Sequence, residues 1–436
     1  MNNSDILILG AGMTGMATGI VSEAPIYEAA DAPGGICSSY YMSAGGDAPL
    51  PQPPPDGEAY RFEIGGGHWI FGGDPAIIHF IRSLVPIQSH SRRSSVYFRS
   101  RSLSVPYPLQ NHLRCLGSEI SLMALQEMAL AGHIRPRTMR EWLDQSFGTT
   151  LTGLFFGPFH ERYTAGLWRD IAPQDDYKSP ATLFLSLQGA IKEAPPVGYN
   201  TTFIYPIDGL DALSRRMAEK CRIRYGKKAI HIDVCGRRIH FADGSSSHYD
   251  KLVSTLPLNQ TLTLAGLNVE APVDPHTSVL VLNIGAVRMP GCPNDHWLYT
   301  HENRSGFHRV GFYSNVDTSF LPTSARISQD RVSIYVERSY RGSEKPHENE
   351  IQVYVRSVIE ELQEWGFIGS VEVIHPTWID VAYTWSWPGS EWKSSALRLL
   401  ENHGIFQVGR YGRWAFQGIA DSIRDGLMVG GALLAS

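Results

Sequence analysis

A short apolar run followed at once by three spaced glycines is the feature of this sequence that most constrains its fold. Residues Ile6 to Leu9 are continuously apolar, as a parallel strand buried on both faces requires. The segment Gly10-Ala-Gly12-Met-Thr-Gly15 follows immediately, so strand, glycine turn and helix are predicted in that order. The chain therefore begins as an α/β unit with a parallel sheet.

Each position of this turn has an expected role if it binds a dinucleotide. Gly10 makes the tight turn, Gly12 lets a pyrophosphate approach the backbone, and Gly15 lets the helix pack on the strand. Met13 and Thr14, in the first helical turn, would offer unpaired backbone amides to the phosphates. A plain strand-to-helix turn could use the same glycines, so the motif needs support from other segments.

The next segment supplies an acidic residue at a suitable distance. A second strand is predicted over Ala24 to Tyr27 and ends in Glu28, whose carboxylate would accept hydrogen bonds from ribose hydroxyls. A further glycine pair, Gly34 and Gly35, follows where a nicotinamide-binding domain would proceed to its next helix. This pair is not typical of a nicotinamide-binding domain.

Two other segments look suited to a large flat cofactor. In one, Gly66 and Gly67 precede His68, so backbone and imidazole could lie close to a ring system, although a structural histidine at a turn is an alternative. The other is near the C-terminus, where a predicted strand ends in Gly-Arg and an apolar helix follows. Its cofactor-binding candidates are Gly409, Arg410, Asp421, Ser422 and Ile423.

The charge balance excludes one class of partner. Lys and Arg number 38 against 43 Asp and Glu, so the formal net charge is −5. No global positive field would hold a nucleic-acid backbone. The partner is expected to be a small molecule, and any anionic part of it must meet a local cationic site.

Cysteine spacing and apolar stretches indicate the compartment. Five cysteines lie far apart without a CxxC pair, which argues against a disulfide framework or a zinc site and for a reducing compartment, so no metal is expected. The start MNNSDILILG lacks the basic segment and cleavage site of a signal peptide. No apolar stretch is long enough to span a membrane. We therefore expect a cytoplasmic protein without membrane contact.

Several motifs along the chain resemble one enzyme family. GxGxxG, then an acid, then a glycine pair is similar to the pattern of amine-oxidase flavoproteins. More specific matches are Gly66 to Phe71 with a GPHIFHT-like segment, Tyr163-Thr164 and Trp168 with Tyr-Thr-x-x-x-Trp, and Gly409 to Gly412 with part of GRxGxxxY. The chain thus resembles the UDP-galactopyranose mutase branch of the FAD-dependent amine oxidase and protoporphyrinogen oxidase superfamily, as a divergent member.

The resemblance implies FAD as the cofactor and an α/β fold. It implies a discontinuous Rossmann-like FAD-binding domain, an inserted helical domain and an antiparallel-sheet substrate domain. The expected boundaries are 1–75, 196–258 and 370–436 for the FAD-binding domain, 105–195 for the helical insertion, and 76–104 with 259–369 for the substrate domain.

The family's functional residues carry over in part. His68 would lie beside the flavin and Arg309 would bind a diphosphate, so these are the catalytic candidates. The substrate-binding candidates are Tyr163, Trp168, Tyr199, Arg309, Tyr383 and Trp385. Because the aromatic residues after 382 alternate at strand spacing, they could instead be core.

This sequence departs from the family at its phosphate-binding residues. A second diphosphate arginine is expected about fourteen residues after Trp168, but Arg169 and Lys178 are the only cations there, and a lysine lacks the bidentate fork. Where the family has a tyrosine closing GRxGxxxY, this chain has Phe416, and Thr384 replaces the second member of a tyrosine pair. A UDP-galactose substrate is therefore open to doubt.

The resemblance leaves three functions open, of which two are enzymatic and one is non-catalytic. The first is a mutase-like flavoprotein that isomerises a nucleotide-linked sugar between pyranose and furanose through N5 of the reduced flavin. The alternative is an oxidoreductase of the amine oxidase or protoporphyrinogen oxidase type acting on a secondary metabolite. A flavin-fold binding protein without catalysis is the third. Whichever function holds, we expect the protein to form a homodimer.

Overall fold

A parallel sheet joins three distant parts of the chain. The computed structural model describes residues 6–132, 135–174, 182–193, 197–198 and 200–435. Its five-stranded sheet has the order β10-β2-β1-β14-β20, and every pairing is parallel. The strands are β1 (Ile6–Leu9), β2 (Ile26–Tyr27), β10 (Ile223–Arg224), β14 (Lys251–Ser254) and β20 (Ile405–Gln407). The predicted discontinuous Rossmann-like α/β fold is confirmed.

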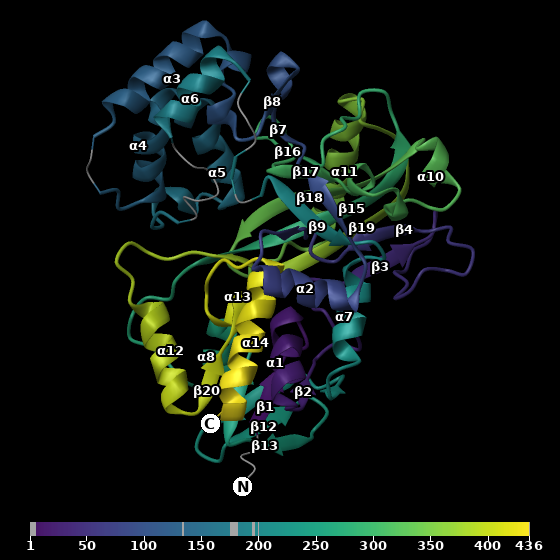
Figure 1. The fold of residues 1–436 in the computed structure, drawn as a ribbon, viewed down its shortest axis with the longest axis vertical. Coiled ribbons are helices and arrows are strands. Elements are labelled where there is room, and N and C mark those ends of the chain that lie inside the picture. The colour runs from purple at the N-terminus through teal and green to yellow at the C-terminus, as the bar shows by residue number, and fades with distance from the viewer. Residues whose placement is uncertain (1–5, 133–134, 175–181, 194–196, 199, 436) are drawn as a thin grey trace.

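Two helices from opposite ends of the chain pack closely on this sheet. They are α1 (Met13–Ser22) and α14 (Ile419–Ala435), which lie side by side in the lower half of Figure 1. A Cβ added to Gly426 would lie 2.4 Å from the carbonyl oxygen of Thr14, and one added to Gly430 would lie 2.7 Å from that of Thr18. Only glycine permits this separation, so these glycines set the distance between the helices.

A seven-stranded sheet lies above the first in Figure 1. Its order is β19-β15-β18-β17-β16-β7-β8, and all its pairings are antiparallel except β16 with β7. The strands are β7 (Ser94–Phe98), β8 (Leu103–Pro106), β15 (His276–Arg288), β16 (Trp297–Tyr299), β17 (Arg309–Phe312), β18 (Arg331–Arg341) and β19 (Ile368–Thr384). Residues 370–384, grouped above with the FAD-binding domain, are here hydrogen-bonded along β15.

A helical insertion occupies the upper left of Figure 1. Its two longest helices are α3 (Ser118–Leu130) and α4 (Met139–Leu151). The α4 N-terminus has a capping box in which Thr138 and Glu141 each bind the other's backbone N–H. The insertion also contains the short turns Leu109–Asn111 and Leu113–Leu116, the π-helix Thr152–Phe156, the turn Leu167–Arg169, and the helices α5 (Gly157–Tyr163) and α6 (Leu183–Ile191).

Smaller elements join the two main sheets. Residues 76–91, expected in the substrate domain, belong to α2 and β6, and β6 pairs with β9 of the segment 196–258. The small sheets contain β3 (Ser39–Met42), β4 (Tyr60–Glu63), β5 (Ile70–Phe71), β6 (Ile87–Ser91), β9 (Thr202–Pro206), β11 (Ala229–Asp233), β12 (Arg238–Phe241) and β13 (Ser246–His248). The other helices are α2 (Pro75–Leu84), α7 (Leu210–Ala218), α8 (Leu258–Leu264), α9 (Tyr313–Val316), α10 (Ala325–Ser328), α11 (Glu348–Glu364), α12 (Trp392–Asn402) and α13 (Gly409–Gly412).

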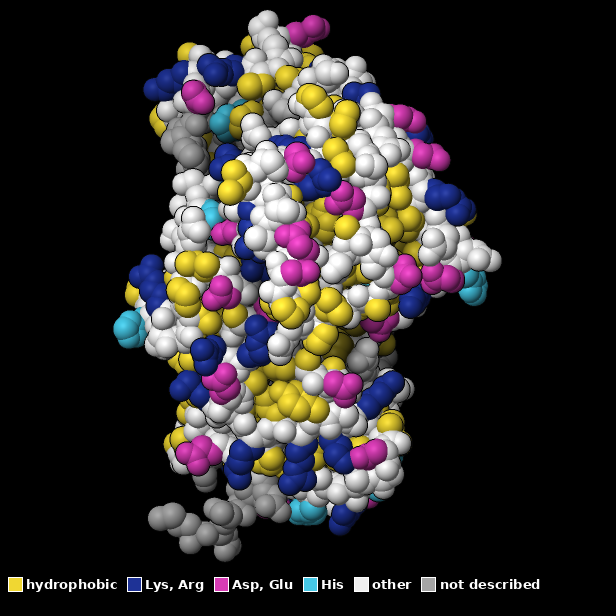
Figure 2. All heavy atoms as spheres, turned by 90° about the vertical axis from the view of Figure 1, so that its right-hand side faces the viewer, with side chains coloured by type: hydrophobic (Ala, Val, Ile, Leu, Met, Phe, Trp, Pro, Cys, Tyr) yellow, Lys and Arg dark blue, Asp and Glu magenta, His cyan; other side chains and the backbone are white. Residues whose placement is uncertain are grey.

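Charges of both signs are interspersed on the face in Figure 2. Over most of this face Lys and Arg lie among Asp and Glu, and only near its lower end do several basic side chains lie together. Among the helices in the described part of the chain, none has the length and apolar composition needed to cross a bilayer.

The glycine contact between α1 and α14 gives a stability prediction. We expect Gly426→Ala to lower the free energy of unfolding by about 1–3 kcal/mol, because the new methyl group must push the helices apart. Gly431→Ala, on the same helix but with no atom within 4 Å of its added Cβ, is the matched control and should be neutral or slightly stabilising. Denaturant unfolding compares the two, and equal effects would contradict the assigned contact.

Candidate functional site

A cavity of about 630 Å³ lies between the two main sheets. This volume is within the range of small-molecule sites, roughly 300–1,000 Å³. Its walls come from the glycine turn after β1, the segment around His68, the end of β19 and the C-terminal segment from Val408 to Ser422. Residues from both ends of the sequence therefore form one site.

The backbone at the first glycine turn can accommodate a phosphate. Gly10 has a φ of +96°, a left-handed conformation that strains any other residue. A Cβ added to Gly12, which caps α1, would meet no atom within 4 Å, so open space adjoins its backbone. The first N–H groups of α1 have no partner within the helix and can bind an anion there.

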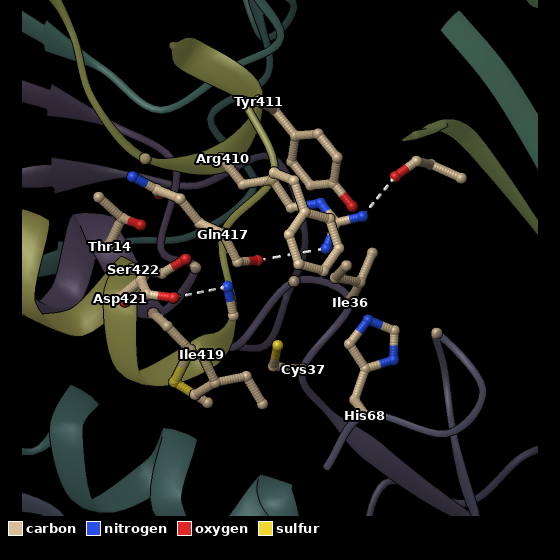
Figure 3. Close-up of a pocket in the computed structure, with 18 of the residues that line it drawn as sticks. Thr14, Ile36, Cys37, His68, Arg410, Tyr411, Gln417, Ile419, Asp421 and Ser422 are labelled. Atoms are coloured by element: carbon tan, nitrogen blue, oxygen red, sulfur yellow. Dashed lines mark hydrogen bonds between the residues drawn. The ribbon is translucent and has the colours of Figure 1, made fainter. Parts of the chain in front are cut away.

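The start of α14 faces the same cavity. Asp421 and Ser422 line its wall, and Figure 3 shows both beside Thr14 of α1. Oδ2 of Asp421 accepts a hydrogen bond of 3.2 Å from the backbone N–H of Gly418, which fixes the turn before the helix. Two helix N-termini thus direct their positive ends at one region, which suits a pyrophosphate.

Glu28 is held at the end of β2 by two backbone donors. Its Oε2 accepts from the N–H of Ala11 at 2.6 Å, and its Oε1 accepts from the N–H of Ala30 at 2.9 Å. The carboxylate lines the cavity beside the glycine turn. It is therefore positioned to accept hydrogen bonds from the hydroxyls of a ribose next to the phosphates.

Arg410 connects the C-terminal segment to β19. Its Nη2 donates to the carbonyl oxygen of Ala382 at 2.9 Å, and its Nη1 donates to that of Gln417 at 3.2 Å, as Figure 3 shows. The guanidinium carbon lies 4.7 Å from the ring centre of Phe416. Arg410 thus supplies a cation to the cavity wall and holds the Phe416 segment against the sheet.

His68 lies on the side of the cavity away from Thr14 and Ser422 (Figure 3). Its Nδ1 is 3.3 Å from the carbonyl oxygen of Gly66. Burial and the positive charge of Arg410 lower the pKa of His68 to about 4. The imidazole is therefore neutral at pH 7 and adds no charge next to a bound ring system.

Arg309 forms a buried ion pair with Glu337. Nε donates to Oε2 at 2.9 Å, and Nη2 donates to both carboxylate oxygens at 2.5 Å. Arg309 on β17 and Glu337 on β18 are directly opposite in the antiparallel register. Burial alone would raise the pKa of Glu337, but Arg309 and His308 lower it to about 2, so the carboxylate stays ionised. The contacts use Nε and Nη2, which leaves Nη1 for another anion.

A second cavity of about 150 Å³ adjoins the first. Arg309, Tyr383 and Phe416 line both, so the two spaces meet there. Its wall is largely aromatic, with rings from the helical insertion facing rings from the sheet: Tyr107, Trp142, Phe155, Phe156, Phe159, Tyr163, Tyr299, Tyr383, Trp385 and Phe416. Such a wall can stack a flat group or enclose an apolar one.

The structure brings most of the predicted cofactor residues to one cavity. Gly10, Gly12, Met13, Thr14, Glu28, Gly34, Gly35, Gly67, His68, Gly409, Arg410, Asp421 and Ser422 line it. Gly15, Gly66 and Ile423 do not. Gly15 instead lets α1 approach β1, since a Cβ there would lie 1.9 Å from the carbonyl oxygen of Gly10. Ile423 is fully buried in the core.

The predicted substrate residues divide in a similar way. Tyr163, Arg309, Tyr383 and Trp385 line the second cavity. Trp168 does not, because its ring packs beneath Gly157 and its Nε1 donates to Glu161 at 2.8 Å. Arg169 is half-exposed and pairs with the same carboxylate, so it supplies no cation to the cavities. Tyr199 and Lys178 lie outside the described residues.

Sequence reasoning missed several lining residues. Glu337 gave no signal of its own, because only the register of β17 and β18 places it opposite Arg309. The run of aromatic residues between 155 and 163 could have indicated the wall of the second cavity, because their spacing puts Phe155, Phe159 and Tyr163 on one helical face. Cys37 and Thr255 follow no motif.

The residues present fit a flavin dinucleotide. The glycine turn and two helix N-termini suit a pyrophosphate, Glu28 suits a ribose, and the region near His68 is bounded by backbone without side chains at Gly65 and Gly67. Among the described residues, no group of three His, Cys, Asp or Glu side chains could hold a metal ion.

Comparison with known proteins is consistent with this arrangement. Residues 23–264 match the model of a family described as flavin containing amine oxidoreductase. The fold is also similar to that of solved flavoproteins along nearly the whole chain.

Three solved structures illustrate this similarity. A structure of reduced UDP-galactopyranose mutase has a TM-score of 0.84 at 21% identity, covering 99% of this chain and 96% of that one. A putative protoporphyrinogen oxidase from Exiguobacterium sp. 255-15 has a TM-score of 0.70 at 13% identity, with 100% of both chains covered. A double mutant of putrescine oxidase has a TM-score of 0.56 at 15% identity, with 99% of both covered.

The position of Glu28 predicts its effect on cofactor affinity. We expect Glu28→Ala to weaken FAD binding by about 1–3 kcal/mol, because the ribose loses its acceptor and the N–H of Ala11 loses its partner. Flavin fluorescence during titration of apoprotein measures the dissociation constant. Asp31→Ala, at an exposed carboxylate three residues away, should leave it unchanged. Equal affinities for all three proteins would contradict the assigned role.

The buried pair predicts a non-additive loss of stability. We expect Arg309→Met to lower the free energy of unfolding by about 3–5 kcal/mol at pH 7, because the Glu337 carboxylate remains buried without its cation. The double variant Arg309→Met/Glu337→Leu should lose clearly less free energy of unfolding than Arg309→Met, because no unpaired charge stays buried. Arg304→Met, which breaks an exposed pair with Glu364, is the control and should change little.

The same pair predicts the pH dependence of this loss. Because the folded pKa of Glu337 is depressed from 4.5 to about 2, the stabilisation from the pair is complete above pH 4.5 and is lost as pH falls toward 2. The difference in free energy of unfolding between wild type and Arg309→Met should therefore decrease as pH falls over that range. Chemical denaturation at several pH values measures it, and a constant gap would contradict the pairing.

Proposed function

The chain belongs to the flavin containing amine oxidoreductase family and is an FAD-dependent enzyme, and from this premise we propose that it is a mutase-like flavoprotein acting on a nucleotide-linked sugar. The observation that carries the proposal is the junction of the two cavities. A substrate in the aromatic cavity would reach the cofactor cavity beside Arg309 and Tyr383. The high fold similarity to a mutase over the full chain supports it.

The residues at this junction suit a nucleotide-linked sugar. Glu337 holds the Arg309 guanidinium in one orientation, and its Nη1 can donate to a phosphate oxygen. The aromatic wall can stack a nucleobase, and its apolar surface excludes water from the sugar. Positioning of this kind is what the chain must supply for ring isomerisation. Reduced FAD, when bound, supplies the nucleophilic ring that allows a sugar ring to open and reclose.

An oxidoreductase is the second candidate, favoured by Phe416. This ring lies at the junction of the cavities and offers no hydroxyl donor to a phosphate. Arg309 is the only Lys or Arg among the described residues that line the second cavity, and Glu337 already offsets its charge. A less charged, partly apolar substrate would suit such a cavity better than a diphosphate.

An assay in two redox states tests the proposal. We expect dithionite-reduced protein to convert UDP-galactopyranose into the furanose form, measured by chromatography, whereas the oxidised protein does not. UDP-glucose serves as a second nucleotide sugar if the galactose form does not react. Arg309→Lys keeps a positive charge beside the Glu337 carboxylate but loses the planar guanidinium fork. It should lower kcat/KM by at least about tenfold.

Other outcomes decide against the mutase function. Peroxide release by the oxidised protein, or substrate-dependent bleaching of the flavin without oxygen, would identify an oxidoreductase. Protein that binds no FAD and shows no yellow colour would contradict both enzymatic functions. Reduced protein that binds UDP but isomerises neither nucleotide sugar would also reject the first candidate for these substrates.

A further inference from the structure

The imidazole of His308 is a buried polar group in the wall of the second cavity. The residue is only 1% exposed. Its two backbone groups are already hydrogen-bonded: the N–H donates to the carbonyl oxygen of Glu337 at 3.0 Å, and the carbonyl oxygen accepts from the N–H of Thr300 at 3.1 Å. The imidazole is therefore the part of His308 that remains for the cavity.

The two ring nitrogens of His308 lack hydrogen bonds. Among the described residues, none forms a hydrogen bond with Nδ1 or Nε2. The rings of Tyr163 and Phe159, whose centres lie 5.4 and 6.1 Å from that of the imidazole, hold it in place. Buried polar atoms in folded proteins are nearly always hydrogen-bonded, so an unpartnered one in a cavity wall indicates a contact with the ligand.

The surroundings of His308 determine which nitrogen carries its proton. Burial lowers the pKa of His308, and Arg309 and Arg162 lower it further against the opposing effect of Glu337. The imidazole is thus neutral at pH 7, with one N–H and one lone pair. Nε2 lies 3.5 Å from Oε2 of the ionised Glu337, which favours the proton on that nitrogen. Nδ1 then keeps the lone pair and is an acceptor that needs a donor from the ligand.

The position of His308 indicates which part of a ligand would supply that donor. His308 precedes Arg309 in the chain, and both side chains approach Glu337. Arg309 lines both cavities, whereas His308 is in the wall of the second. If Nη1 of Arg309 binds a diphosphate and the aromatic wall stacks the base, the group between them is the ribose. A ribose hydroxyl is a donor of the kind that Nδ1 requires.

We propose that His308 is a specificity-determining residue that accepts a hydrogen bond from a ribose hydroxyl of the substrate. The second cavity then selects a ribonucleotide over a nucleotide that lacks this hydroxyl. Discrimination of this kind is strong, because the analogue leaves a buried polar atom of the site without its partner. The inference deepens the proposed function and rests on it, since only a nucleotide-linked substrate brings a ribose to this cavity.

Binding of UDP and its analogues to the FAD-loaded protein tests this role without turnover. Isothermal titration calorimetry measures the dissociation constants of UDP, 2′-deoxy-UDP and 3′-deoxy-UDP. We expect one of the two deoxy analogues to bind wild type at least about tenfold more weakly than UDP. The analogue that loses affinity identifies which ribose hydroxyl His308 binds.

Variants of His308 test whether this residue causes the preference. His308→Phe keeps a flat ring but has no acceptor, so it should bind UDP and both deoxy analogues with affinities within about twofold of each other. His308→Gln has an amide oxygen that accepts a hydrogen bond and should restore part of the preference. The wild-type comparison needs no variant, so it tests the proposal even if His308→Phe does not fold.

His301→Phe is the control for these variants. Nδ1 of His301 is also buried without a hydrogen-bond partner in the described part of the chain. His301 is not among the residues that line either cavity, however. This variant should therefore keep the wild-type affinities for all three nucleotides. An unchanged flavin spectrum in each variant shows that it is folded.

Four results would overturn the proposal. Wild type could bind UDP and both deoxy analogues equally, or the preference could persist unchanged in His308→Phe, which would assign the hydroxyl to another residue. A loss of affinity confined to N3-methyl-UDP would assign His308 to the base. Wild type that binds none of these nucleotides would reject the proposed function as well. In contrast, a ribose preference that depends on His308 in a protein that isomerises no nucleotide sugar would confirm the inference and reject only the proposed reaction.

Discussion

The close packing of α14 on α1 is the contact on which the rest of the site depends. Gly426 and Gly430 allow the C-terminal helix to approach the carbonyl oxygens of Thr14 and Thr18, distances that a methyl group would prevent. This contact brings the start of α14 to the start of α1, so that Asp421 and the glycine turn after β1 reach the same cavity. Each helix offers one set of unpaired N–H groups, and their proximity gives an anion donors from both ends of the chain. The fold needs both ends of the chain before the cofactor has a place to bind.

Strand β19 connects this cofactor site with the second cavity. It belongs to the seven-stranded sheet, yet its last residues line both cavities, and the carbonyl oxygen of Ala382 accepts a hydrogen bond from Arg410 of the C-terminal segment. The two sheets are thereby held in one orientation by a charged donor and a backbone acceptor in the cavity wall. Phe416, one of the residues at which this chain departs from the mutase pattern, lies against the same guanidinium and is held by the same contact.

Patterns that act locally could be predicted from the sequence, whereas those that depend on strand register could not. The glycine turn, Glu28 and the Gly409-Arg410 segment have their own spacing, and all of them line one cavity. Trp168 matched a motif, yet the structure buries it behind the wall, because a motif does not say which side of a short turn faces the ligand. Glu337 could not be found at all: its role follows from lying opposite Arg309 across an antiparallel pair 28 residues apart.

The charge of the second cavity limits which ligands it can bind. Arg309 brings one positive charge, and Glu337 offsets it at contact distance, so the pair presents little net charge to a ligand. The pair can still offer a hydrogen bond in a fixed direction. The Glu337 carboxylate determines the position of the guanidinium, and Nη1 is the donor. A diphosphate bound there would gain a well-placed hydrogen bond but little Coulomb attraction, since a nearby carboxylate repels it. The binding energy of a nucleotide-linked sugar must then come mainly from stacking on the aromatic wall of the second cavity, which offers it abundantly. Because Glu337 offsets the charge of Arg309, the cavity can also bind substrates with fewer charges. The cations around the flavin therefore do not distinguish the two reactions, whereas the redox state in which the flavin acts does.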